Sequence, residues 1–125
     1  MIVTDASVAE FVERIIGRPI IPPFTCIGVE RDGVVVAGAV FNCYTRADIH
    51  VTVAGLPTRS LIRSVGKYAY GQLGCQRMTV ITEQPKIAEY AQRLGGAVEG
   101  ILRNQFGAGR DGVLIGILRD DWKLA

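Results

Sequence analysis

The segment from Val34 to Phe41 constrains the fold more than any other part of the sequence, because it is apolar at every position. A strand that is apolar on both faces is typical of the centre of a covered sheet. The preceding Arg31, Asp32 and Gly33 include an Asp-Gly pair, a strong signal for a tight turn between antiparallel strands. Residues Thr25 to Glu30, before this turn, are therefore predicted to form the first strand of a hairpin.

Segments with apolar residues at helical spacing alternate with further strand-like segments. The predicted helices run from Ser7 to Gly17, from Thr58 to Gly74 and from Gln84 to Gly95. Ser7 with Glu10 is a capping-box pattern, and Thr58 is the predicted N-cap of the second helix. The remaining predicted strands are Ile49–Val53, Met78–Thr82, Ala97–Leu102 and Val113–Leu118.

This order of elements predicts an α/β fold, with a mixed sheet that carries helices on both faces. A length of 125 residues is typical of one domain, so we expect residues 1–125 to form a single unit. In the strand Ile49–Val53, His50 and Thr52 share one face, and the three apolar residues share the other.

Composition and charge exclude several classes of function. The formal net charge of +2 gives no sign of a nucleic-acid surface, and the longest apolar run is far shorter than a membrane span. The sequence opens without a secretory-signal pattern, so we expect a cytoplasmic protein with no membrane contact. Cys26, Cys43 and Cys75 have no close spacing and the chain has one histidine, His50, so the sequence offers no Cys and His ligand set and no metal is expected.

Several spaced segments resemble the Gcn5-related N-acetyltransferase (GNAT) superfamily. Leu73–Thr79 is similar to the end of the cofactor-side helix and the start of the next strand in that family, and Gln84–Gly95 has the spacing of the following helix. The stretch from Glu99 to Asp111 is similar to the C-terminal part of the family. The hairpin Gly28–Gly33 and the His50 strand resemble short GNAT proteins of phages and prophages.

This resemblance implies transfer of an acetyl group from acetyl-CoA to a primary amine. The acceptor would be an amine-bearing small molecule or a protein. It also implies that the strands Ile49–Val53 and Met78–Thr82 splay apart and that the pantetheine arm of the cofactor inserts between them. The implied cofactor-binding residues are Val51, Thr52, Val53, Thr58, Arg59, Ser60 and Gln84. Thr58, Arg59 and Ser60 would present helix N–H groups to the pyrophosphate.

The resemblance leaves the catalytic residues less well defined. His50 is a candidate general base, because its side chain titrates near neutral pH; a structural histidine is the alternative interpretation. Tyr90 is a candidate acid for the departing thiolate, or a packed tyrosine with its hydroxyl at the surface. The family places its tyrosine where this chain has Ala91. Asp48, Glu99 and Asp111 occur singly and are interpreted as solvated carboxylates.

Other functions stay open. The glycine-rich phosphate loop of the family is absent, since the segment from Leu56 to Ser60 contains no glycine. A GNAT-fold binding or interaction module with weak or no activity is therefore the main alternative, followed by an unrelated α/β scaffold. A homodimer formed through the last strands is expected by analogy. Burial within the chain would explain the apolar segment Val113–Leu118 equally well.

Overall fold

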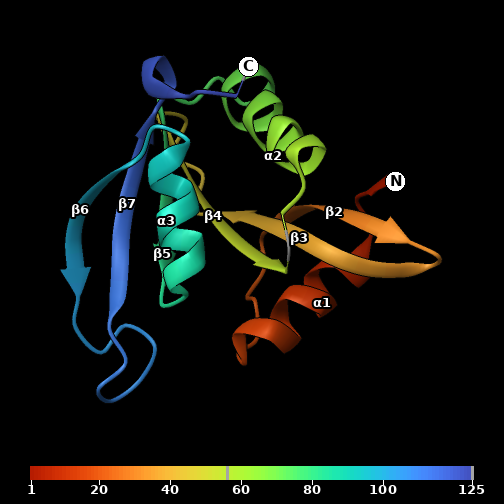
Figure 1. Ribbon diagram of the computed structural model, residues 1–125, viewed down its shortest axis with the longest axis horizontal. Helices are drawn as coiled ribbons and strands as arrows, with labels where there is room; N and C mark the ends of the chain where they lie inside the picture. The colour runs from red at the N-terminus through yellow and green to blue at the C-terminus, as the bar shows by residue number, and fades with distance from the viewer. Residues whose placement is uncertain (56, 125) are drawn as a thin grey trace.

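The computed structural model describes residues 1–55 and 57–124. The chain folds around one mixed sheet with strands in the order β1-β2-β3-β4-β5-β7-β6 (Figure 1). The strands are β1 (Ile2–Val3), β2 (Thr25–Arg31), β3 (Val34–Asn42), β4 (Asp48–Gly55), β5 (Arg77–Thr82), β6 (Ala97–Leu102) and β7 (Gly112–Leu118). The helices are α1 (Ala6–Ile16), α2 (Arg59–Gly66), the π-helix η1 (Lys67–Gln72), α3 (Pro85–Arg93) and the 3₁₀-helix η2 (Arg119–Asp121).

Helices cover both faces of the sheet, as the sequence predicts. Ile49 and Val51 of β4 belong to a buried cluster with α2 and η1, whereas Ala54 packs with Val8 and Val12 of α1 on the opposite face. Helix α3 packs on β5 and β7 through a third cluster that includes Val80. Met78 of β5 packs with α2, and side chains two residues apart share a face, so α2 and α3 lie on the same side of the sheet.

The apolar segment that begins at Val34 is the central strand β3, and this prediction is confirmed. Residues 37–41 of the strand are buried, with α1 on one face and α2 on the other. The predicted turn is also present: Asp32 has φ 53° and Gly33 has φ 77°. Two successive residues with positive φ are what a tight hairpin of this type requires.

Three local features differ from the sequence prediction. Helix α1 is capped by Asp5, whose carboxylate accepts a hydrogen bond from the backbone N–H of Ser7, so Ser7 lies inside the helix and is not its cap. The short strand β1 was not predicted. Two residues are too few to show the alternating pattern of a strand, and β1 pairs only with β2. The helix that begins after Thr58 is α-helical only to Gly66 and continues as the π-helix η1.

The π-helical turn has a tertiary cause. The N–H of Leu73 bonds to the carbonyl of Tyr68, five residues earlier. Arg119, beyond β7, donates from Nη1 to the carbonyl of Tyr70 at 2.7 Å, and the hydroxyl of Tyr70 donates to the carbonyl of Ile117 at 2.6 Å. Since these partners come from the other end of the chain, the end of this helix depends on β7 and η2.

No helix among the described residues is long and apolar enough to cross a membrane.

Candidate active site

The main feature of the candidate site is a gap between β4 and β5. The two strands pair in parallel only at Asp48↔Arg77, Ile49↔Met78 and His50↔Thr79. Beyond these pairs the ladder stops, although β4 continues to Gly55 and β5 to Thr82. The splay of these two strands, expected from the resemblance, is therefore present.

The backbone polar groups of Val53 point into this gap. Its carbonyl accepts a hydrogen bond from Nε2 of Gln84, at 3.2 Å, so the side chain of Gln84 spans from the start of α3 to β4. The N–H and C=O of one strand residue point to the same side of the strand. The N–H of Val53 therefore also points toward β5, where the ladder has ended, and it is available to a ligand.

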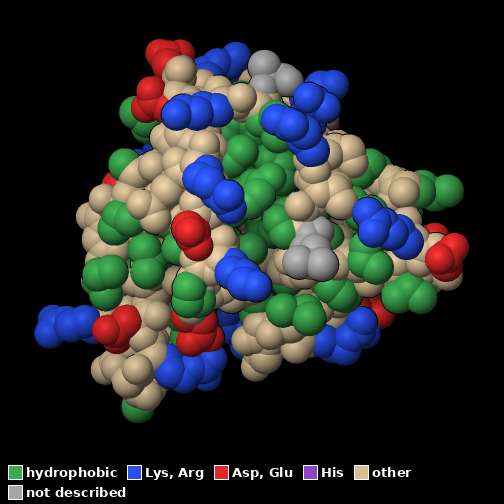
Figure 2. All heavy atoms as spheres, in the orientation of Figure 1, with side chains coloured by type: hydrophobic (Ala, Val, Ile, Leu, Met, Phe, Trp, Pro, Cys, Tyr) green, Lys and Arg blue, Asp and Glu red, His purple; other side chains and the backbone are tan. Residues whose placement is uncertain are grey.

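Two pockets open into the gap from opposite faces of the sheet, and both are lined by Val51, Val53, Val80 and Ile87. The helix-side pocket lies between α2 and α3 and is almost entirely apolar. Its other walls include Pro57, Ile62, Tyr90, Leu94 and Trp122. Figure 2 shows apolar side chains in a hollow between α2 and α3, with Lys and Arg side chains on its rims.

The loop-side pocket opens on the face that α1 covers and has a volume of about 140 Å³. Its polar walls include Arg18, Thr52, Glu83, Gln84 and Arg110, and Phe106 from the β6–β7 loop also contributes. The gap is therefore reached by an apolar route from one face and by a polar route from the other.

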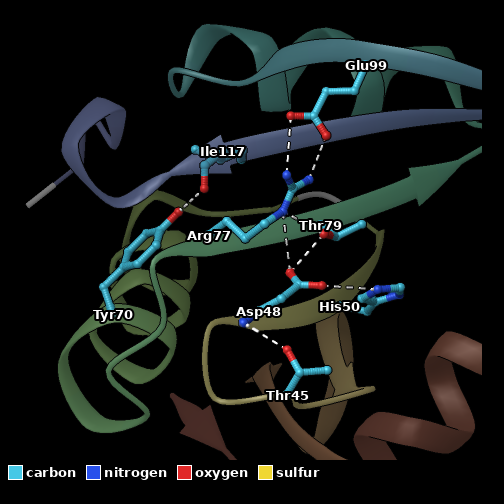
Figure 3. A network of polar contacts seen from close by, with 8 residues as sticks. All are labelled: Thr45, Asp48, His50, Tyr70, Arg77, Thr79, Glu99 and Ile117. Carbon is cyan, nitrogen blue, oxygen red and sulfur yellow. Dashed lines mark hydrogen bonds and ion pairs between the residues drawn. The ribbon is translucent and has the colours of Figure 1, made fainter.

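His50 belongs to a network of polar side chains on the face of the loop-side pocket (Figure 3). Its Nε2 lies 3.3 Å from Oδ2 of Asp48. The other oxygen of Asp48 accepts a hydrogen bond from the hydroxyl of Thr79 at 2.8 Å and lies 3.6 Å from Nε of Arg77. The side chain of Asp48 is only 20% exposed, so this carboxylate is held by protein groups more than by water.

Arg77 extends the network across the sheet to Glu99. Its guanidinium donates to both carboxylate oxygens of Glu99, at 2.7 and 3.3 Å, and from Nε to the hydroxyl of Thr79 at 3.1 Å. The ion pair of Arg77 and Glu99 lies over Gly116 of β7, where a Cβ would lie 2.4 Å from the Glu99 carboxylate. The hydrogen bonds that Arg77 donates to the Glu99 carboxylate raise the pKa of Arg77 above its ordinary value, so this arginine stays charged.

The interpretation of the single carboxylates as solvated groups was wrong for Asp48, which is mostly buried and is held by Thr79 and Arg77. Glu99 and Asp111 are both exposed: Glu99 pairs with Arg77, and Asp111 accepts through Oδ1 from the N–H of Asn104. Part of this arrangement could have been read from the sequence, because Asp48 and His50 are two residues apart on a predicted strand and must share a face. Arg77 and Glu99 carried no comparable signal.

Tyr90 lies on the other side of the sheet from His50. It lines the helix-side pocket, and the guanidinium of Arg93 stacks 5.5 Å from the centroid of its ring. Ala91, at the position where the family has its tyrosine, is buried against β5 and β7. The structure therefore does not bring the two candidate catalytic side chains together: Tyr90 lines the helix-side pocket, whereas His50 lies on the opposite face, two residues before Thr52 of the loop-side pocket, and lines neither pocket.

The start of α2 is capped by a side chain and is exposed at its first two residues. The hydroxyl of Thr58 caps the helix by accepting from the N–H of Leu61 at 3.1 Å, while Arg59 and Ser60 are exposed. Gly55, just before this segment, has φ 85°, and a Cβ there would lie 2.4 Å from the carbonyl oxygen of Val36. This glycine therefore serves the packing of β4 on β3. Leu56 lies outside the described residues.

Of the other predicted cofactor-binding residues, Val51 and Val53 line both pockets, and Thr52 and Gln84 line the loop-side pocket. Sequence reasoning missed four residues that line the same pocket: Arg18 just after α1, Glu83 between β5 and α3, and Phe106 and Arg110 in the β6–β7 loop. No sequence signal joins these segments, because they meet only in the folded chain.

This fold, a mixed sheet with a parallel pair of strands that splays apart and helices on both faces, is that of the GNAT N-acetyltransferases. The chain is similar in structure to a single-residue variant of spermidine N-acetyltransferase from Vibrio cholerae. The TM-score is 0.72 at 14% sequence identity, with 96% of this chain and 94% of that chain covered.

A second similar structure is the spermidine N-acetyltransferase from Vibrio cholerae in complex with CoA and spermine. Its TM-score is 0.72 at 14% identity, with 97% of this chain and 96% of that chain covered. A chimera of the Vibrio cholerae enzyme with hSSAT has a TM-score of 0.70 at 15% identity, with 96% of each chain covered. Neither a protein-family model nor the sequence of a curated protein matches the chain. The fold predicted from the sequence is thus confirmed, while the resemblance to phage and prophage proteins stays a prediction.

Proposed function

We propose that this protein is an acetyl-CoA-dependent N-acetyltransferase that acts on a primary amine. The observation that carries the proposal is the gap between β4 and β5, which is open to an apolar pocket on one face and to a polar pocket on the other. A structural neighbour of the same fold has been determined in complex with CoA and spermine. Two routes to one gap suit a reaction in which donor and acceptor approach from opposite sides.

The helix-side pocket fits the donor. Its apolar walls suit the pantetheine arm, and the backbone of Val51 would pair with an amide of that arm. At the entrance, Thr58, Arg59 and Ser60 would bind the pyrophosphate through N–H groups at the start of α2 and the charge of Arg59. The Lys and Arg side chains on the rims of the hollow (Figure 2) favour an anionic ligand. Gln84 would stay bonded to Val53 and hold the gap open.

The chemistry assigned to this chain is positioning and proton transfer. Acetyl-CoA, when bound, supplies an acetyl thioester as the electrophile. The N–H of Val53 would polarise the thioester carbonyl, and holding the amine beside it accounts for most of the rate. His50, supported by Asp48, would accept the proton of the amine on the loop side. Tyr90, on the helix side, would donate a proton to the leaving thiolate.

The remaining expectations about partners carry over as part of the proposal. The acceptor is a small amine or an amine of a protein, with no nucleic-acid or membrane partner and no metal. A homodimer and a cytoplasmic location are expected on the same basis as before.

Calorimetric titration with CoA and with acetyl-CoA tests the donor site. We expect micromolar binding, with affinity about fivefold weaker in Arg59→Gln because one charged contact to phosphate is lost. Arg31→Gln, at the exposed end of β2, is the matched control and is expected to bind like the unmodified protein. Absence of binding at millimolar cofactor would contradict the proposal. Binding without acetyl transfer to any amine would favour the alternative, a binding module with the same fold.

A further inference from the structure

The charge of the loop-side pocket bears on what the acceptor is. The charged side chains that line this pocket are Arg18, Glu83 and Arg110. Arg110 donates to both carboxylate oxygens of Glu83, through Nε at 3.1 Å and through Nη2. This bidentate pair is neutral as a unit and uses both oxygens of the only carboxylate among the lining residues. Arg18 therefore supplies the net charge of the pocket.

Arg18 is held in place without being neutralised. Its guanidinium lies over the ring of Phe106, 4.9 Å from the centroid, and so joins the end of α1 to the β6–β7 loop. Among residues 1–55 and 57–124, no carboxylate lies within ion-pair distance of Arg18. Stacking uses the flat face of a guanidinium, whereas its N–H donors lie in the plane and point outward. An exposed cation that stacks on Phe106 and has no ion pair among the described residues thus stands at the wall of the pocket.

We infer that the acceptor is a small primary amine that also carries an anionic group, such as a carboxylate, and that Arg18 binds this group. This inference rests on the proposed function and specifies its substrate. The volume of about 140 Å³ is close to that of cavities that hold a ligand the size of benzene, so the acceptor is small. With the anion at Arg18, the amine faces the gap between β4 and β5, on the same side of the sheet as His50.

The same geometry disfavours spermidine and spermine, the amines for which the structural neighbours are named. Spermidine and spermine carry only cationic groups at neutral pH, and a second ammonium group in this pocket would lie close to Arg18. Like charges in a partly closed pocket repel each other, and the carboxylate of Glu83 is already bound to Arg110. Substrate choice in this chain is therefore expected to differ from that of the proteins whose fold it shares.

The test compares β-alanine, propylamine and trimethylenediamine, which share a carbon chain and differ in the charge at the far end. Release of CoA from acetyl-CoA gives kcat/KM for each amine, and NMR titration measures the binding of each amine without turnover. We expect kcat/KM for β-alanine to exceed that for propylamine about tenfold, because one charge-assisted contact differs. Trimethylenediamine should be the poorest of the three.

Variants separate the role of Arg18 from general effects. Arg18→Gln should abolish the advantage of β-alanine, and Arg18→Glu should invert the order in favour of trimethylenediamine. Arg14→Gln, an exposed arginine on α1 that does not line the pocket, is the matched control and should keep the wild-type order. Equal or better use of the neutral or dicationic amine, or a β-alanine preference that survives in Arg18→Glu, would overturn the inference.

The two measurements also separate this inference from the proposed function. Binding of β-alanine that depends on Arg18, without CoA release from any amine, would refute the acetyltransferase proposal and retain the anion site. Acetylation of the other amines without binding of β-alanine would refute the anion site and retain the acetyltransferase proposal.

Discussion

Nε2 of His50, the one histidine of the chain, lies 3.3 Å from Oδ2 of Asp48, and Asp48 is held in turn by Thr79 and Arg77. A carboxylate beside one ring nitrogen stabilises a hydrogen on that nitrogen and leaves the other as the acceptor. We therefore expect neutral His50 to carry its hydrogen on Nε2 and to expose the lone pair of Nδ1. Long-range ¹H–¹⁵N spectra of the protein report this directly, because there is one imidazole to observe.

Substitutions test whether this pair takes part in the reaction. His50→Ala is expected to lower kcat/KM about 100-fold or more, as the loss of a general base does. Asp48→Asn should lower it less and should change the ¹⁵N shifts of His50, because the carboxylate no longer selects the tautomer. Thr45→Val is the control, since the hydroxyl of Thr45 accepts from the backbone N–H of Asp48 and not from its side chain. Full activity in His50→Ala would remove His50 from the mechanism.

Gly66 lets Trp122 pack against α2. A Cβ at Gly66 would lie 2.5 to 2.7 Å from atoms of the indole ring, and Trp122 also forms part of the helix-side pocket. Gly66→Ala should therefore displace the indole and lower the free energy of unfolding by about 1–3 kcal/mol, less any gain in helix propensity. Urea unfolding followed by the fluorescence of the sole tryptophan measures both effects.

Gly71→Ala is the matched control for that substitution. Gly71 lies in the π-helical turn η1, is exposed, and has no atom within 4 Å of where its Cβ would be. We expect unchanged tryptophan fluorescence and a stability equal to or slightly above that of the unmodified protein. Loss of stability in Gly71→Ala comparable to that in Gly66→Ala would show that the indole contact is not the cause.

Tyr70 makes stability depend on pH in the alkaline range. Burial raises the pKa of its hydroxyl above the ordinary value of 10.0, and the hydroxyl donates to the carbonyl of Ile117. A raised pKa in the folded state means that the unfolded chain loses this proton first. The stabilisation is complete below pH 10.0 and is lost progressively as the pH rises above that value.

We expect the free energy of unfolding to fall less steeply above pH 10.0 in Tyr70→Phe than in the unmodified protein. Chemical denaturation at a series of pH values gives both slopes. Tyr44→Phe makes the same change at an exposed tyrosine and should keep the original slope. Identical slopes in all three proteins would mean that the titration of Tyr70 is not coupled to folding.

The three cysteines should differ in reactivity. Cys43 is exposed, whereas Cys26 and Cys75 are buried, and burial raises the pKa of both buried thiols. The thiolate is the reactive form, so a raised pKa and lack of access both slow alkylation. Brief treatment of the folded protein with iodoacetamide at pH 8 is expected to add one label, at Cys43, and treatment in denaturant three. Rapid labelling of Cys75 in the folded protein would show that the core around η1 opens.

Local patterns in the sequence were sufficient to predict most of the fold. The all-apolar segment that became β3, the Asp32–Gly33 turn and the Thr58 cap depend on residues close together in the chain, and the structure contains all three. The alternation in β4 was also enough to separate His50 from the apolar face. Such features follow from backbone geometry and the burial of apolar side chains, which act over a few residues at a time.

Tertiary structure decided what these elements do together. It joined the π-helical end of the second predicted helix to the C-terminal part of the chain, through the bond from Arg119 to Tyr70. It joined Asp48 and Glu99 through Arg77, and it placed Arg18 on Phe106 beside the gap. These contacts join residues far apart in the sequence, and the strength of each depends on a distance and an orientation that no local pattern encodes. The sequence alone thus determined the elements and their order, whereas the charge and shape of the candidate site arose only when the sheet brought distant strands and loops together.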